Sequence, residues 1–140
     1  MNGPTLAAVM IGRARRFATI GEHLAPIAPA LALHGLAIAI ELSLKAAILD
    51  RGGTDERNRA EIRHNLRHAE CVARDYGFQA SPALARLASR LTPYYKDYGF
   101  HGLAALAPTL LNGELHAMVD TVAVHVDAVR VWMRAARRRR

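Results

Sequence analysis

One long apolar segment constrains the fold of this chain more than any other feature. Residues 24–40 span 17 positions without a single Asp, Glu, Lys or Arg. The helical continuation of this segment meets Glu41 and Lys45 and ends at two glycines, 52 and 53, which form a natural left-handed helix cap. Because almost every face of this helix is apolar, we predict that it is the central and most buried helix of the protein.

A membrane helix or a cleaved signal peptide is the alternative interpretation of the same segment. Its 17 residues lie at the short limit for a membrane span, and it contains Pro26, Pro29 and His34. Glu22 and His23 also interrupt the apolar run that a signal peptide needs. We therefore expect no membrane association. The single cysteine, Cys71, allows no intrachain disulfide and favours a reducing, cytoplasmic location.

Helical periodicity continues through the rest of the chain. It predicts helices near residues 6–20, 29–51, 54–76, 81–93 and 109–134, with an irregular stretch at 93–108. No stretch shows the sustained alternation of a β-strand. A length of 140 residues with 51% hydrophobic residues suits one hydrophobic core. We predict a single domain over residues 1–140, an all-α, up-and-down bundle of about five helices.

The last predicted helix carries an apolar seam whose spacings alternate between four and three residues. Such a seam packs along another helix, in the same chain or in a partner. We expect His125 on this seam to be a packed histidine with one hydrogen-bonded nitrogen. If the seam is a dimer interface, protonation of His125 would weaken the dimer below about pH 6.5. The seam consists of Leu111, Leu115, Met118, Val122, His125, Val129 and Trp132.

The net charge of +7 belongs to the two ends of the chain. Arg13, Arg15 and Arg16 lie near the start, and the middle of the sequence is neutral. We expect the basic tail at 137–140 to be a frayed, solvated helix end; the alternative is contact with phosphates of RNA or DNA. The nucleic-acid contacts would then be Arg137, Arg138, Arg139 and Arg140.

The most informative motif lies within residues 33–78. Glu41 and Lys45 belong to an alanine- and leucine-rich helix, Gly53 follows in a turn, and His64-Asn65-Leu66 opens the next helix. This pattern resembles the HEPN family (higher eukaryotes and prokaryotes nucleotide-binding domain), in which aspartate is usual at the position of Asn65. The resemblance implies a bundle of four or five helices that often dimerises, commonly in toxin–antitoxin or phage-defence systems.

Glu41 and Lys45 are one helical turn apart, in the favourable orientation for an ion pair. Two interpretations are open. The pair is either a structural link between helices, extended by His64, or the polar floor of a cleft that holds a nucleotide or a base. In the second case the ligand-binding residues are Glu41, Lys45, His64 and Asn65.

The resemblance also implies a possible enzyme, because many members are metal-independent ribonucleases. They use an arginine and a histidine separated by four to six residues, joined across a dimer interface. Arg63 and His68 match with four intervening residues, and Arg57 and His64 match with six. The histidine would take the proton of a ribose 2′-hydroxyl, and the arginine would stabilise the charge that develops on phosphorus.

Our leading hypothesis is a HEPN-like binding or interaction protein, expected as a homodimer, whose partner is RNA, a nucleotide or another protein. A ribonuclease toxin is the runner-up, and a helical scaffold without a small ligand is the third interpretation. We predict no cofactor and no metal site, and we expect His116, Asp120 and Asp127 to form a hydrated polar face. The scaffold requires Glu41 and Lys45 to form a closed, buried pair, whereas the enzyme requires Arg63 and His68 to be exposed together.

Overall fold

The computed structural model describes the backbone of residues 2–138 and the side chains of residues 2–135. This part of the chain contains no strand, which confirms the all-α prediction. A short 3-10 helix at Ala107–Thr109 precedes the last of six α-helices. The α-helices are α1 (Gly3–Leu24), α2 (Pro29–Asp50), α3 (Asp55–Glu61), α4 (Leu66–Asp75), α5 (Pro82–Leu106) and α6 (Glu114–Arg138).

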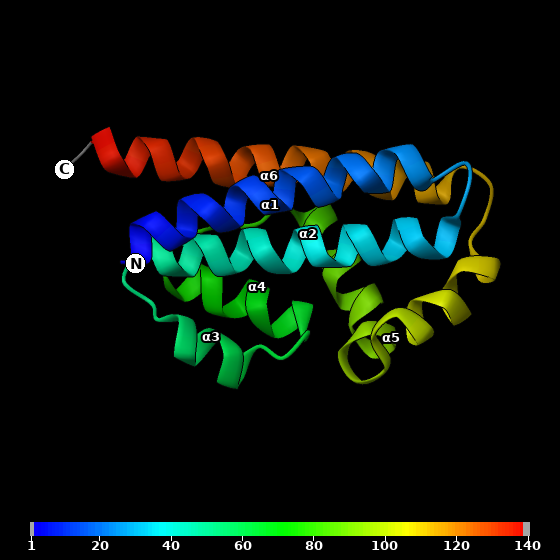
Figure 1. The fold of residues 1–140 in the computed structure, drawn as a ribbon, viewed down its shortest axis with the longest axis horizontal. Helices are drawn as coiled ribbons and strands as arrows, with labels where there is room; N and C mark the ends of the chain where they lie inside the picture. The colour runs from blue at the N-terminus through cyan, green and yellow to red at the C-terminus, as the bar shows by residue number, and fades with distance from the viewer. Residues whose placement is uncertain (1, 139–140) are drawn as a thin grey trace.

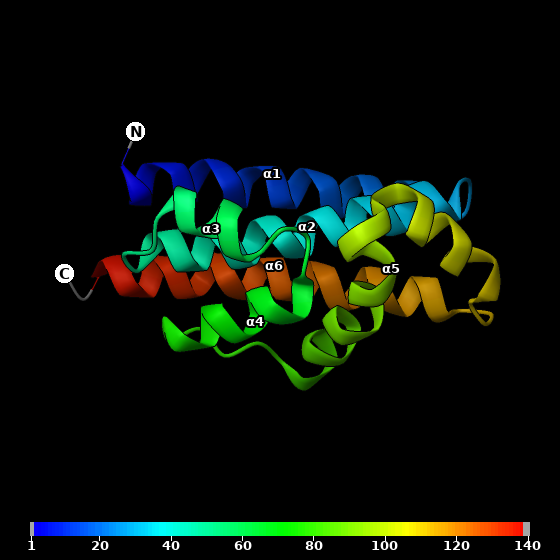
Figure 2. The ribbon, with the colours of Figure 1, turned by 90° about the horizontal axis from the view of Figure 1, so that it is seen from below.

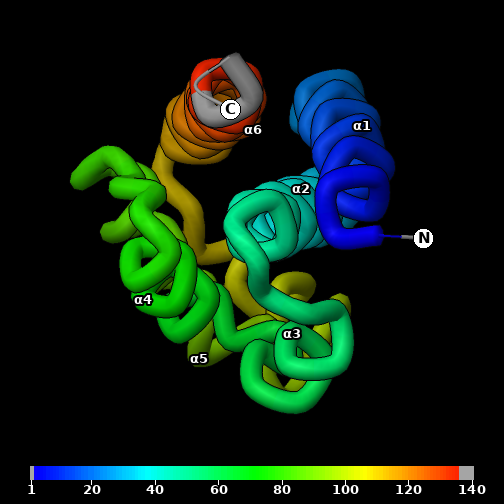
Figure 3. The backbone as a smooth tube through the Cα atoms, turned by 90° about the vertical axis from the view of Figure 1, so that its left-hand side faces the viewer, coloured from blue at the N-terminus to red at the C-terminus, as the bar shows by residue number. Residues whose placement is uncertain are grey.

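Helix α2 is the centre of the bundle. In Figure 3 it lies between α1 and α6 on one side and α3 and α4 on the other. Fifteen of its 22 residues are buried. Its length and apolar composition would also suit a membrane span, but 72% of the apolar window is buried within the bundle. Packing on all sides thus accounts for the absence of a polar face.

Helices α1 and α2 form a closely packed hairpin (Figure 1). Two glycines face each other where these helices approach. A Cβ atom on Gly21 would lie 2.7 Å from Cδ2 of Leu36, and one on Gly35 would lie 3.3 Å from the carbonyl oxygen of Phe17. Larger side chains at either position would push the two helices apart.

The helix predicted across residues 54–76 is wrong, because the chain breaks it between α3 and α4. Arg63 and His64 adopt positive φ angles of 41° and 66°. The break is stabilised on both sides: Ile62 is buried in the core, and Asn65 caps α4 by accepting a hydrogen bond from the backbone N–H of His68 at 3.0 Å. A side chain that caps a helix competes with continuation of the preceding one.

The irregular stretch predicted at 93–108 is also wrong, since α5 continues through Pro93. The carbonyl of Ser89 loses its helical donor there, but Ser89 and Pro93 are both exposed and water can satisfy it. The helix bends at Gly99, where φ is 54° and ψ is −129°. Its last turns fold back so closely that a Cβ on Gly102 would lie 1.7 Å from the carbonyl oxygen of Tyr94. Figure 2 shows this bend at the end of the bundle.

The predicted seam of α6 packs inside the chain, against α1 and α2. Its buried members are Met118, Val122, His125 and Val129, whereas Leu111 is exposed and precedes the helix. His125 is the packed histidine that we predicted, with Nε2 at 2.9 Å from Oγ of Ser43. Because this seam packs within the core of one chain, the condition for the predicted effect of His125 protonation on a dimer is not met.

Candidate functional site

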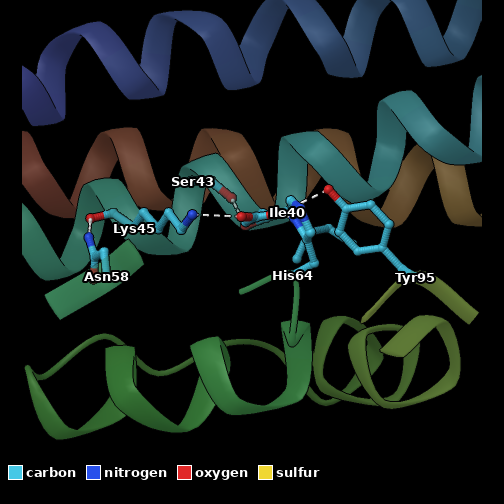
Figure 4. Close-up of polar contacts among 7 residues, drawn as sticks. Ile40, Ser43, Lys45, Asn58, His64 and Tyr95 are labelled. Atoms are coloured by element: carbon cyan, nitrogen blue, oxygen red, sulfur yellow. Dashed lines mark hydrogen bonds and ion pairs between the residues drawn. The ribbon is translucent and has the colours of Figure 1, made fainter. Parts of the chain in front are cut away.

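A buried carboxylate, that of Glu41, receives hydrogen bonds from three different elements. Its side chain is only 7% exposed. Lys45 on α2 donates to Oε2 at 2.6 Å, while Nδ1 of His64 and the hydroxyl of Tyr95 donate to Oε1 at 2.7 and 2.9 Å. Figure 4 shows Lys45, His64 and Tyr95 turned toward the same stretch of α2. The carboxylate therefore connects α2 to the α3–α4 loop and to α5.

The charge states within this cluster follow from its burial and its hydrogen bonds. Burial acts to raise the pKa of Glu41, but the hydrogen bonds from His64 and Lys45 and the positive charge of Lys45 outweigh it, so the pKa lies below its ordinary value. Burial and the charge of Glu41 raise the pKa of Tyr95 far above its ordinary value. Glu41 is therefore ionised and accepts only, so Tyr95 and Nδ1 of His64 each carry the hydrogen that they donate.

His64 is the member of the cluster that reaches solvent. Its side chain is 55% exposed, and its ring lies 4.9 Å from that of Tyr95. The bond to Glu41 fixes Nδ1, and no other described residue forms a hydrogen bond with Nε2. In the neutral ring Nε2 therefore carries a lone pair, oriented by the buried carboxylate and free to accept a proton or a hydrogen bond.

The side chains of the other predicted ligand-binding residues form hydrogen bonds or ion pairs within the protein. Glu41 and Lys45 close on each other, and the buried Asn58 donates to the carbonyl of Lys45 at 3.4 Å. The side chain of Asn65 caps α4. This closed pair is the arrangement that the scaffold interpretation requires for Glu41 and Lys45. The sequence did not single out Tyr95, because three tyrosines lie within 94–98 and their spacing does not say which one points inward.

Two exposed arginines lie close to His64 in the sequence. Arg63 precedes His64 in the loop, and Arg67 lies in the first turn of α4; both are exposed. The backbone N–H of Arg67 donates to Oγ1 of Thr92 at 3.0 Å, which holds this turn against α5. Neither arginine forms an ion pair with a described acidic residue, whereas acidic neighbours bind Arg57, Arg59 and Arg74.

The two arginine–histidine pairs that match the ribonuclease spacing differ in their surroundings. Arg63 and His68 are both exposed, but no described interaction joins them or orients the ring of His68. In the other pair His64 is oriented by Glu41, but Arg57 is held by Glu61 at 3.1 Å. Of these histidines, only His64 is oriented by a described hydrogen bond, and Arg63 and Arg67 are its exposed neighbours in the sequence.

The remaining predicted residues lie elsewhere. Arg137–Arg140 fall outside the residues whose side chains are described. His116 and Asp120 are exposed and 3.8 Å apart on α6, and Asp127 binds Arg130 at 3.1 Å. Within the described part of the chain, no three His, Cys, Asp or Glu residues lie close enough to hold a metal ion.

Comparison with known proteins found no match to this chain among family models, curated proteins or solved structures. The resemblance to the HEPN family thus rests on the motif within residues 33–78.

Proposed function

We propose that this protein binds single-stranded RNA on the surface formed by the α3–α4 loop and the first turn of α4. One observation carries the proposal: an exposed imidazole, His64, is oriented by a buried carboxylate and lies close in the sequence to Arg63 and Arg67, which form no ion pair with a described acidic residue. The resemblance to the HEPN family supports the same ligand class and suggests a role in a toxin–antitoxin or phage-defence system.

The chemistry of these side chains suits the sugar–phosphate backbone of RNA. Each guanidinium offers a planar fork of donors that matches two phosphate oxygens. Nε2 of His64 would accept a hydrogen bond from a ribose 2′-hydroxyl, the group that distinguishes RNA from DNA. Glu41, Lys45 and Tyr95 would act by holding His64 in place, without touching the ligand.

The binding test compares two pairs of arginines with equal charge. Arg63→Asn with Arg67→Gln removes two cations from the proposed surface; Asn suits position 63 because it tolerates a positive φ. Arg13→Gln with Arg16→Gln removes two exposed cations from α1 and is the matched control. Binding of a short, labelled, mixed-sequence RNA is followed by fluorescence anisotropy at several salt concentrations.

We expect the first pair to weaken binding at least about fivefold and to flatten the dependence of log K on log salt by about 1.4, since two phosphate contacts are lost. The control pair should stay close to the wild type. Equal effects of both pairs would mean that net charge alone attracts the RNA, and the proposed surface would be abandoned.

A second candidate function, metal-independent RNA cleavage, is favoured by the 2.7 Å contact between Nδ1 of His64 and Glu41. Nε2 would remove the proton of a 2′-hydroxyl, the 2′-oxygen would attack phosphorus, and the 5′-oxygen would leave and take a proton from water. The products would be a 2′,3′-cyclic phosphate and a 5′-hydroxyl. Arg63 or Arg67 would stabilise the charge on the phosphoryl oxygens, as general acid–base and electrostatic catalysis require.

Cleavage of end-labelled RNA in the presence of EDTA tests this candidate. His64→Asn keeps a donor near Glu41 and a residue that tolerates the positive φ, but it removes the base. His68→Asn is the matched control. Loss of cleavage in the first variant alone supports His64, while loss in the second alone supports the pair Arg63 and His68. An inactive wild type rejects the enzyme, and the anisotropy experiment then decides on binding separately.

A further inference from the structure

A second imidazole, that of His34 on α2, lies next to the candidate site. His34 precedes Glu41 by seven residues, which is two helical turns, so both side chains project from the same face of α2. The ring of His34 lies 6.1 Å from that of Tyr95, and the ring of His64 lies 4.9 Å from it. The two histidines therefore contact the same tyrosine ring.

Unlike His64, His34 forms no hydrogen bond with a described residue. Its side chain is half-buried, and burial lowers the pKa of the imidazole, with a smaller contribution from the charge of a protonated His64. The ring is therefore uncharged at neutral pH, with one nitrogen that donates and one that accepts. Since a half-buried polar group without a partner costs free energy, these nitrogens favour a ligand that offers both an acceptor and a donor.

Aromatic rings continue from His34 to the end of α5. The ring of Phe100 lies 5.6 Å from that of His34, and the ring of the exposed His101 lies 6.0 Å from that of Phe100. Phe100 is half-buried and directly follows the bend at Gly99. In Figure 2 the α3–α4 loop and the bent end of α5 lie on the same side of α2. A connected series of rings therefore leads from His64 through Tyr95 and His34 to Phe100.

We infer that His34 and Phe100 form a subsite for one nucleobase of the RNA, next to the sugar–phosphate contacts of His64. A nucleobase is a flat aromatic ring whose edge carries hydrogen-bond donors and acceptors. Phe100 would stack on its face, and the nitrogens of His34 would bind its edge. This inference rests on the proposed function and adds a specificity to it, because phosphate contacts position a nucleic acid whereas base contacts read its sequence.

The stacking test compares two labelled ligands of equal length by fluorescence anisotropy: a short mixed-sequence RNA, and an oligomer with the same ribose–phosphate backbone but no bases. Phe100→Leu removes the aromatic face and keeps an apolar side chain. We expect it to weaken binding of the RNA at least about fivefold and to leave binding of the base-free oligomer unchanged, which also shows that the variant is folded. Phe17→Leu, the same change at a half-buried phenylalanine of α1, is the matched control.

A second variant, His34→Leu, tests recognition of the base edge. It removes both ring nitrogens, so we expect it to reduce the differences in affinity among short oligomers of uridine, adenosine and cytidine. His116→Leu, a change at an exposed histidine of α6, should keep these differences. A wild type that binds the three oligomers equally overturns the role of His34.

The two ligands separate this inference from the proposed function. If Arg63→Asn with Arg67→Gln weakens binding of both ligands while Phe100→Leu weakens neither, the RNA surface stands and the base subsite is overturned. Equal affinity of the wild type for both ligands also overturns the subsite, as does a Phe100→Leu variant that loses both ligands alike. A wild type that binds neither ligand overturns the subsite and the proposed function together.

Discussion

The buried histidine of α6, His125, makes the stability of the bundle depend on pH. Its side chain lies in the core with only 3% of the residue exposed. The hydroxyl of Ser43 donates to the carbonyl of Ile40 at 2.9 Å, so Nε2 of His125 must donate to Ser43. Burial lowers the pKa of His125 to about 4.

The sign and size of the effect follow from this pKa. The unfolded chain binds a proton at its ordinary value of 6.5, whereas the folded chain resists it until about 4. The neutral, buried His125 therefore makes its full contribution to the stability of the folded chain above pH 6.5, and this contribution is lost as the pH falls toward 4. Each unit of pKa difference is worth about 1.4 kcal/mol, so the total loss is about 3 kcal/mol, of which about 2 kcal/mol disappears by about pH 5.

Urea unfolding followed by circular dichroism between about pH 8 and about pH 5 measures this loss. Glu41 does not contribute to the change between these two pH values, because its pKa is lowered and it destabilises the fold only as the pH falls below about 4.5. His125→Leu removes the titrating group and leaves Ser43 bonded to Ile40. We expect this variant to lose about 2 kcal/mol less than the wild type over the window. His101→Gln, a change at an exposed histidine, should behave like the wild type.

Two results would refute the reasoning. One is an equal loss of stability in the wild type and in His125→Leu. The other is a ring-proton resonance of His125 that titrates near its ordinary pKa of 6.5 in the folded protein, since the ring would then be hydrated and able to carry charge inside the bundle.

Three further predictions concern stability, measured as the free energy of unfolding in urea. Glu41→Ala removes the acceptor from the buried Tyr95, the half-buried Lys45 and the exposed His64 and should cost about 3 to 5 kcal/mol. Gly102→Ala should prevent the bend of α5, because its Cβ would overlap the carbonyl oxygen of Tyr94, whereas Gly12→Ala meets nothing within 4 Å and should stabilise α1 by up to about 1 kcal/mol. Asn65→Ala should cost about 1 kcal/mol by removing the cap of α4, and Asn65→Asp should keep the cap and the stability.

Local chemistry explains which features of the fold were predictable. Because nearly every face of α2 is apolar, the sequence predicted that this helix lies at the centre of the bundle. Thr54 and Ser81 cap the N-termini of α3 and α5, as expected for a threonine and a serine directly before a helix. The 3.5-residue seam of α6 predicted the burial of Met118, Val122, His125 and Val129, but it missed the buried Val119, Val126 and Met133. In each case the information lies within a single helix and its flanking residues, so no knowledge of tertiary contacts was needed.

Features that depend on tertiary contacts were not predictable. The apolar spacing from Ile62 to Tyr76 fits one helix, but burial of Ile62 and capping by Asn65 favour two. Pro93 normally ends a helix, yet α5 continues through it where both Pro93 and Ser89, four residues earlier, are exposed. The inward direction of Tyr95 depends on the carboxylate of Glu41, which is 54 positions away in the chain.

The break between α3 and α4 is also what creates the candidate site. Glu41 and Lys45 pair within one helix, but His64 reaches Glu41 only because the chain leaves the helical path at residues 62–65. Left-handed backbone at Arg63 and His64 costs roughly 1 kcal/mol or more for each residue, and a hydrogen bond to a buried carboxylate is of a size to offset much of that cost. The same bond orients the imidazole. The strained loop and the exposed imidazole are therefore one feature, in which Glu41 stabilises the loop conformation that leaves Arg63, His64 and Arg67 exposed.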